Sequence, residues 1–551
     1  MRKTFTRLLS VCMVVVMIVG LAGCAKSEKS TQDIFASGQT KSDSSSYKTE
    51  YTMDTSKATV NSNVEYETMA GEYDQEFITD RSFTEEFNTE EYSGITENNI
   101  KAVKNYPMST FSVDVDTASY SNVRRMINNN GEVVPDAVRI EEMINYFKYD
   151  YESPMGDVPF SVNTEISDCP WNKDAKLLLI GLQAKDIDLA DRPSSNLVFL
   201  LDVSGSMYSD DKLPLMQKAF IMLTENLNEN DRISIVTYAG MDRVILEGVR
   251  GDETMKIVSA IEELSAGGST AGAAGIEKAY SIAEEYFIED GNNRIILATD
   301  GDLNVGITSE GELKRLVEKE RKKGVFLSVL GFGTGNIKDN KMETLADNGN
   351  GNYSYIDSIL EAKKVLVDEM GGTLFTIAKD VKLQIEFNPA YIKGYRLIGY
   401  ENRLLNTEDF NDDTKDAGEI GAGHRVTALY EIIETSSEQE IAEADLKYQS
   451  DKEEVDSNEW LTVNIRYKEP KKDKSQLISV PVDEKNYSST MPENLAFASS
   501  VAAFGMLLRD SKWKGDASYD MILDILEDQD LSHDEYKDEF ISLVKKMKRV
   551  G

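Results

Sequence analysis

The chain has 551 residues, of which 97 are acidic and 60 are basic, so its net charge is −37. At the usual size of about 150 residues per domain, this length predicts three to four domains. A chain this negative is repelled by phosphate backbones and by anionic lipid head groups, which argues against nucleic acid as a partner.

Residues 1–23 have the composition of a secretory signal peptide. Basic residues precede an apolar run that begins at Leu8, and small residues lead into Cys24. The ending LAGC is similar to a bacterial lipobox, which implies that the thiol of Cys24 carries a diacylglyceryl group. An uncleaved transmembrane anchor is the alternative, but the run is shorter than the about 20 residues that a spanning helix needs. We therefore expect an exported protein, lipid-anchored to the extracytoplasmic face of the bacterial cell membrane.

Residues 24–104 are rich in Ser, Thr, Glu, Asp and Asn and show no sustained period of 2 or 3.6, which indicates a disordered tether. About eighty flexible residues have an end-to-end distance on the order of 50 Å. Beyond the tether, Cys169 is the one remaining cysteine, so the mature chain cannot form a disulfide within itself. We expect it to be a small buried side chain; a reactive thiol is the alternative.

Residues 105–190 predict an N-terminal flanking region of α/β character. STFSVDV alternates like a strand, two helical segments follow, and PFSVNTEIS and AKLLLIGLQAKD are typical of antiparallel strands. Asp114 and Asp116 face one way on the first strand. For these two side chains we expect turn and capping roles, with a second cation site as the alternative.

Residues 191–372 alternate short apolar runs with helical segments. Strands that are apolar on both faces indicate a doubly wound, mostly parallel sheet covered by helices, with DRVILEG as an antiparallel edge strand. Residues 373–490 are rich in strands, and residues 491–551 are helical. NLAFASSVAAFGMLL is too short to span a bilayer and predicts a buried core helix.

Strand-rich segments lie on both sides of this α/β unit. The pattern predicts one β-sandwich that is interrupted by an insertion. We therefore expect residues 158–188 to pair with strands from residues 374–483.

Oxygen-bearing side chains follow the strands of the α/β unit. Asp202, Ser204 and Ser206 form a D-x-S-x-S motif directly after an apolar strand, and ligands of open parallel sheets bind at the carboxyl ends of strands. Such oxygen ligands suit Mg²⁺, Mn²⁺ or Ca²⁺ rather than zinc. SAGGSTAG adds Thr270, and RIILATDGD adds Asp300.

With these three motifs, residues 196–370 resemble a von Willebrand factor type A domain with a complete metal-ion-dependent adhesion site. The resemblance implies a Rossmann-like fold and five metal ligands: Asp202, Ser204, Ser206, Thr270 and Asp300. Ser269 is the alternative to Thr270, and Asp302 is expected to orient metal-bound water or to be a solvated loop acid. Mg²⁺ is the expected cation, with Mn²⁺ or Ca²⁺ as alternatives.

The resemblance extends into the flanking regions. STFSVDVDTASYSNVRRMIN and YRLIGYENRLL look like segments of a family of bacterial von Willebrand A-domain lipoproteins, so that the resemblance spans most of residues 105–550. In this family the open position on the metal accepts a carboxylate, which implies a protein partner that offers Asp or Glu. The helix near residues 358–370 slides in related domains, and here it leads into the strand-rich region.

Three functions follow from the sequence. We expect metal-dependent binding of a protein partner, and the alternative is an envelope assembly scaffold in which the metal only braces the site. The third is a serine hydrolase, in which Ser204 or Ser206 would need a base. The two histidines are His424 and His533, and neither serine lies in a G-x-S-x-G motif, so we do not expect an enzyme.

Overall fold

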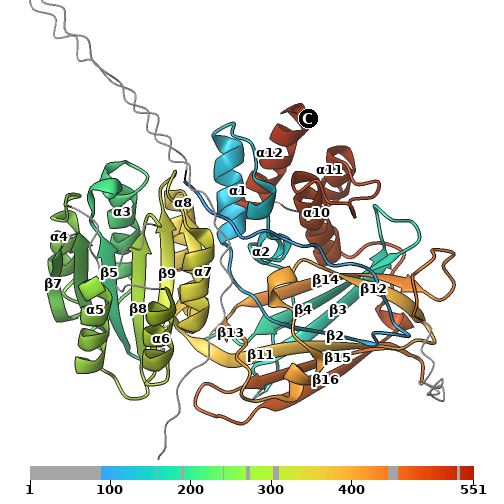
Figure 1. Ribbon diagram of the computed structural model, residues 1–551, viewed down its shortest axis with the longest axis horizontal. Coiled ribbons are helices and arrows are strands. Elements are labelled where there is room, and N and C mark those ends of the chain that lie inside the picture. Colours follow the sequence, from blue (N-terminus) through green and yellow to red (C-terminus); the bar gives the residue numbers. More distant parts are fainter. Residues whose placement is uncertain are drawn as a thin grey trace, which may run out of the picture. The chain divides into compact units, whose positions relative to one another are not determined.

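The computed structural model describes the chain in several stretches (Figure 1). The described residues are 89–156, 158–187, 192–239, 241–268, 273–301, 310–444, 457–529, 531 and 534–550. The predicted signal peptide and Cys24 lie outside them. No helix within the described stretches combines the length and the apolar character that crossing a membrane requires.

Six strands form the sheet of the α/β unit. In spatial order they are β10 (Tyr353–Ile356), β9 (Val325–Phe332), β8 (Asn292–Thr299), β5 (Ser195–Asp202), β6 (Arg232–Ala239) and β7 (Met241–Arg250). Neighbouring strands are parallel, except that β7 is antiparallel to β6. The predicted mostly parallel sheet and its antiparallel edge strand are confirmed.

Helices cover both faces of this sheet. Along β5, Leu197, Phe199 and Leu201 pack into one hydrophobic cluster, whereas Val198 and Leu200 pack into another, as the period of 2 requires. The first face is covered by α3 (Leu213–Thr224), α4 (Thr254–Glu262) and α8 (Ile359–Lys363), and the second by α5 (Ala273–Glu285), α6 (Glu310–Arg321) and α7 (Asp339–Asn348).

The flanking regions form a β-sandwich. One sheet has the order β1 (Lys101–Ala102), β12 (Ile392–Ile398), β14 (Arg425–Glu434), β4 (Lys176–Ala184) and β3 (Phe160–Asp168). The other contains β13 (Gly418–Gly421), β11 (Thr376–Phe387), β15 (Glu459–Lys468) and β16 (Gln476–Asp483), with β2 (Met108–Ser112) paired to β11. One hydrophobic cluster lies between the sheets. Because β4 pairs with β14, the predicted pairing across the insertion is confirmed.

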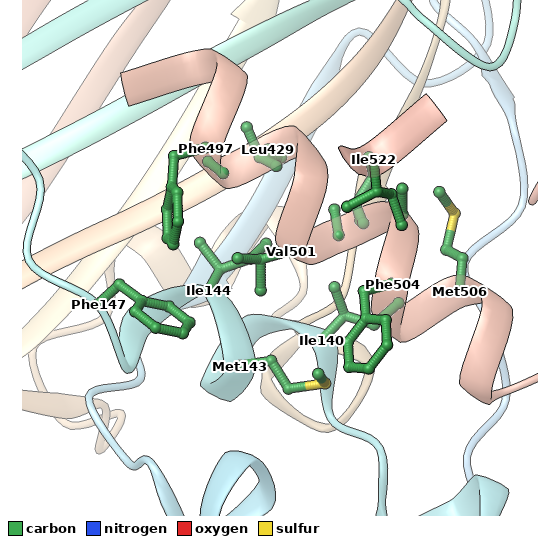
Figure 2. Packing of buried hydrophobic residues seen from close by; sticks show 14 of the residues in the cluster. Ile140, Met143, Ile144, Phe147, Leu429, Phe497, Val501, Phe504, Met506 and Ile522 are labelled. Carbon is green, nitrogen blue, oxygen red and sulfur yellow. The ribbon is translucent and has the colours of Figure 1, made fainter. Parts of the chain in front are cut away.

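Helices from both ends of the described chain cover the outer face of the first sheet. They are α1 (Ala118–Asn128), α2 (Ile140–Asn145), α10 (Glu493–Leu508), α11 (Tyr519–Glu527) and α12 (Glu535–Val550). Figure 2 shows Ile144 of α2 and Val501 of α10 within this cluster, which Leu429 of β14 joins. The predicted buried core helix is confirmed as α10. Cys169 is buried in the same cluster, as expected, and burial raises the pKa of its thiol.

The chain leaves the α/β unit through a broken helix. The predicted continuous helix near residues 358–370 consists of α8, a π-helical turn η3 (Lys364–Asp368) and α9 (Met370–Leu374), which leads into β11. Short 3₁₀ turns lie elsewhere, at η1 (Pro135–Ala137), η2 (Gly205–Tyr208), η4 (Glu401–Arg403), η5 (Thr407–Asn411) and η6 (Glu484–Asn486).

Both connections of the α/β unit are held by the turn between β13 and β14. The segment that leads toward β5 is fixed by a hydrogen bond from Gly423 N to Lys185 O of 3.1 Å. The segment that follows α9 is fixed by a hydrogen bond from Ala422 N to Phe375 O of 2.8 Å. The two ends of the insertion therefore lie close together on the sandwich.

The α/β unit meets the flanking regions through buried arginines. Arg124 of α1 bonds to Asp357, which precedes α8, and to Glu361 within α8, and the Arg124 side chain is 1 % exposed. Similarly, Arg139 bonds to Asp339 of α7. A third arginine, Arg403 of η4, bonds to acids on both sides: Asp114, Asp116, Glu343 and Asp347.

The folded unit begins earlier than the sequence predicts. Residues 89–104 were expected to belong to the tether, yet Asn98 donates hydrogen bonds to Leu397 O and Gly399 O, and β1 pairs with β12. The predicted boundary at residue 104 is therefore too late. Val103 is buried between the sheets, but the two-residue strand β1 is too short to show a period in the sequence.

Candidate metal site

Two acidic residues meet at the carboxyl edge of the parallel sheet. Asp202 is the last residue of β5, and Asp300 follows the neighbouring strand β8. Both side chains are buried. Thr299 Oγ1 donates a hydrogen bond of 3.2 Å to Asp202 Oδ2 and accepts one of 3.2 Å from Gly301 N. Thr299 thereby ties the two strand ends together.

The serines of the D-x-S-x-S motif form the rim of the site. Ser204 N donates to Asp202 Oδ1 at 2.9 Å, which fixes the turn after β5. The two hydroxyls are 2.9 Å apart, with Ser204 buried and Ser206 exposed on η2. The carboxylate and the two hydroxyls therefore face one side of the turn, and that side reaches solvent at Ser206.

The segment that leads toward Thr270 lies against the same turn. Gly267 N donates to Val203 O at 2.9 Å, and Gly205 N donates to Gly268 O at 3.2 Å. Gly268 has a φ of +86°, and a Cβ there would lie 3.0 Å from Ala239 O, so glycine is required. Thr270 itself, Ser269 and Asp302 lie outside the described residues. Four of the five predicted ligands are thus brought to one edge of the sheet.

Sequence reasoning missed Lys212, which lies at the start of α3. Its Nζ is 3.0 Å from Asp300 Oδ2, and the side chain is buried. Two carboxylates and one ammonium leave a formal charge of −1 among the described groups. A bound dication would raise that charge to +1, which favours an incoming carboxylate. No local pattern in the sequence links Lys212 with Asp300, because the two residues are 88 positions apart.

The electrostatics and the donor atoms fit a hard cation. Burial, together with the charge of Asp300, raises the pKa of Asp202 to about 6, because the buried carboxylate lacks full charge compensation. No cluster of three or more His, Cys, Asp or Glu side chains able to hold a metal exists in the described stretches, so the site depends on hydroxyl ligands. Carboxylate and hydroxyl oxygens suit Mg²⁺, Mn²⁺ or Ca²⁺.

His424, the histidine within the described residues, is not a partner of either serine of the motif. The Ser204 hydroxyl pairs with the Ser206 hydroxyl and also interacts with the Asp202 carboxylate. His424 lies between β13 and β14 and packs on Gly372, and burial lowers its pKa to about 4. His533 lies outside the described residues.

Asp114 has the expected turn role, whereas Asp116 binds the start of β10 and caps no helix. Asp116 N donates to Asp114 Oδ1 at 2.9 Å, and Tyr353 N donates to Asp116 Oδ1 at 2.8 Å. Both carboxylates also pair with Arg403. These contacts account for the two acids without a second cation.

Comparisons with known proteins agree with the fold. The von Willebrand factor type A domain model matches residues 196–367, and a model described as von Willebrand factor matches residues 86–179. The α/β unit is therefore a von Willebrand factor type A (VWA) domain.

The remaining comparisons concern the whole chain. A model of the C-terminal part of uncharacterized protein YfbK matches residues 372–550. Uncharacterized protein YfbK of Escherichia coli (strain K12) is 44 % identical over 446 residues, which are 79 % of this chain and 76 % of that protein. The chain belongs to the YfbK family.

More distant similarities cover parts of the chain. Uncharacterized protein sll0103 of Synechocystis is 31 % identical over 185 residues, or 34 % of this chain and 43 % of its own length. A von Willebrand factor type A structure from Catenulispora acidiphila covers 72 % of this chain and 91 % of its own, with 15 % identity and a TM-score of 0.40. Mussel byssus proximal thread matrix protein 1, described with a zinc-occupied MIDAS motif, covers 32 % and 45 %, with 22 % identity and a TM-score of 0.27.

Proposed function

We propose that the VWA domain binds a divalent cation and, through it, a carboxylate of a protein partner. The observation that carries the proposal is the convergence of Asp202, Ser204 and Ser206 with buried Asp300 at one sheet edge. Thr270 completes the proposed ligand set. Mg²⁺ is the proposed cation, with Mn²⁺ and Ca²⁺ as alternatives.

The chain's own residues prepare this site. The Ser204 N to Asp202 Oδ1 bond holds the turn, and Lys212 offsets one of the two negative charges. When bound, the cation supplies a Lewis-acid position for the partner's carboxylate. Exposed Ser206 marks the open side, and Tyr208 next to it is 83 % exposed, which gives a partner an aromatic surface beside the metal.

We further propose that the protein is exported and anchored by a lipid on Cys24, facing away from the cytoplasm. The LAGC sequence before the tether supports this placement. Cell fractionation of the wild type and of Cys24→Ser tests it. We expect the wild type in the membrane fraction and the variant outside it; membrane association of both proteins would contradict the lipid anchor.

A metal that only braces the site is the second candidate. It is favoured by the burial of Asp202, Ser204 and Asp300 and by the existing Lys212–Asp300 ion pair. In that case the protein is an assembly scaffold whose contacts lie elsewhere. Both candidates bind metal, and neither is an enzyme.

Mn²⁺ titration and affinity capture from membranes separate these proposals. We expect Asp202→Ala to lose Mn²⁺ binding and to capture no partner, and EDTA to release captured partners from the wild type. Asp210→Ala, which removes an exposed carboxylate from the same loop, serves as the matched control. Capture that persists in EDTA and in Asp202→Ala, although both lack metal, would support the scaffold and refute the metal bridge.

A further inference from the structure

A short segment before the first strand lies along a loop of the VWA domain. Residues 89–92, here called the N-terminal strap, run parallel to residues 335–338, which follow β9. Thr89 N donates to Gly335 O at 2.8 Å, and Glu91 N donates to Ile337 O at 2.9 Å. The strap therefore adds a strand-like edge to the loop of residues 333–338.

Charged side chains secure the N-terminal strap. Arg125 of α1 binds both carboxylate oxygens of Glu90, at 2.9 and 3.0 Å, and Gly335 N donates to Glu90 Oε1 at 3.0 Å. The Arg125 and Glu90 side chains are 11 % and 6 % exposed. Lys338 Nζ lies 2.7 Å from Glu91 Oε1. A bidentate pair with so little exposure is stronger and more directional than a surface ion pair.

The loop held by the strap contacts the candidate metal site at Gly301, the residue after Asp300. Gly301 has a φ of +105°, and a Cβ there would lie 2.5 Å from Asn336 O and 2.8 Å from Lys338 N. The loop backbone thus packs directly on the turn that carries Asp300. A shift of the loop changes the space in which that turn can lie.

The same loop also contacts Lys212, the residue that pairs with Asp300. The Lys212 stem lies against Gly333, where any side chain would collide with it. Tyr355 Oη donates a hydrogen bond of 2.6 Å to Gly333 O, and the Arg125 guanidinium lies 5.4 Å from the centre of the Tyr355 ring. Arg125 therefore contacts both Glu90 of the strap and Tyr355, which binds Gly333 beside the Lys212 stem.

Open space borders this loop on one side. A cavity of about 370 Å³ lies between α1 and the VWA domain, and its lining includes Arg125, Asp211, Gly333, Thr334 and Tyr355. On that side the loop is not packed, so the strap contacts at residues 335–338 add to the support that Gly301, Lys212 and Tyr355 give it. Loss of the strap contacts leaves the loop room to move.

We propose that the N-terminal strap is a positioning element of the metal site, so that cation affinity depends on whether the strap is docked. The inference rests on the proposed function and adds a regulatory input to it. Because binding linkage is reciprocal, cation binding also stabilises the docked strap. A displacement of the strap therefore changes the affinity of the site for its partner.

Mn²⁺ binding by the full chain tests this inference. Glu90→Gln removes the charge that Arg125 binds, and Glu90→Arg places two like charges together. We expect both variants to weaken Mn²⁺ binding about tenfold, which lies within the range typical of coupling between two distinct sites. Asp252→Asn, which breaks the exposed bidentate pair with Arg250, is the control and should bind like the wild type.

Hydrogen exchange supplies a readout that does not depend on affinity. In the wild type, Mn²⁺ should slow amide exchange in residues 89–92 and 333–338, and in Glu90→Arg this protection should be lost. Equal Mn²⁺ affinity of the wild type and both Glu90 variants would overturn the inference and leave the proposed function standing. A wild type that binds no Mn²⁺ would overturn the proposed function as well.

Discussion

The flanking regions pack against themselves and against the VWA domain by different means. Val501 of α10 and Leu429 of the sheet below it belong to one hydrophobic cluster, in which the rings of Phe504 of α10 and Phe540 of α12 lie 5.4 Å apart. At the boundary with the VWA domain, buried charges dominate instead. Arg403 faces four carboxylates there, two from each side: Asp114, Asp116, Glu343 and Asp347.

The apolar contacts and the buried ion pairs differ in their sensitivity to pH and to substitution. Apolar burial is insensitive to pH and tolerates changes of shape, whereas a buried ion pair fails when one partner is lost. Burial raises the pKa of Asp116, Glu343 and Asp347, so a surplus of acid is held at this boundary. The sandwich is therefore a stable base, and the boundary is the place where solution conditions act on the VWA domain.

Removal of Arg124 should have the largest effect. In Arg124→Ala, Asp357 and Glu361 stay buried without their cation, so we expect the free energy of unfolding to fall by about 3–5 kcal/mol. Urea unfolding measures the loss. The control is Arg321→Ala, which removes the partner of a half-exposed Asp416 and should cost far less. Equal losses would mean that the buried pair has no special role.

Acid should act through His424, which lies beside the point where the VWA domain rejoins the sandwich. Its pKa is about 4 in the folded chain against 6.5 when unfolded, so protonation favours the unfolded state. The contribution of His424 to the free energy of unfolding is fully present above pH 6.5. It falls by roughly 3 kcal/mol as the pH drops toward 4.

The measurement is thermal unfolding at pH 7 and pH 4.5. Other groups titrate in the same range, so the difference between the wild type and His424→Gln isolates the contribution of His424. We expect the variant to lose less stability on acidification. Parallel pH profiles of the two proteins would show that His424 does not carry the effect.

A conservative change in the apolar cluster should have the smallest effect. Ile144→Val removes one methylene beside Val501, and we expect a loss of about 0.5–1.5 kcal/mol. Because no charge changes, the loss should be the same at pH 7 and pH 5.5 in urea unfolding. A loss that varied with pH would contradict the expected difference between the apolar cluster, which is insensitive to pH, and the charged boundary with the VWA domain.

The sequence predicts what is local and misses what is distant. Strand periodicity and the spacing of D-x-S-x-S place Asp202, Ser204 and Ser206 at the end of a parallel strand, where the structure has them. Lys212 and Asp300 are 88 residues apart, and Arg403 pairs with residues up to 289 positions away. Such pairs combine residue types that also occur on any solvated surface, so nothing in a single sequence distinguishes them.

The pairing of β4 with β14 shows which part of a strand pairing the sequence predicts and which part it does not. Alternation on both sides of the insertion indicates that the two segments share a sandwich, but many registers satisfy the same alternation. Tertiary packing selects the one in which Leu182 is opposite Val426 and Leu178 is opposite Tyr430. The segment could be predicted, and the register could not.

The two hydrogen bonds that hold both connections of the VWA domain to one turn have a consequence for chain entropy. They fasten Lys185 and Phe375 to neighbouring residues, Gly423 and Ala422, so the sandwich treats the whole VWA domain as one closed loop. The cost of closing a loop rises by only about 0.6 kcal/mol for each doubling of its length. An insertion of very different size would therefore burden the sandwich little, so the sandwich does not set the length of the chain inserted at this point.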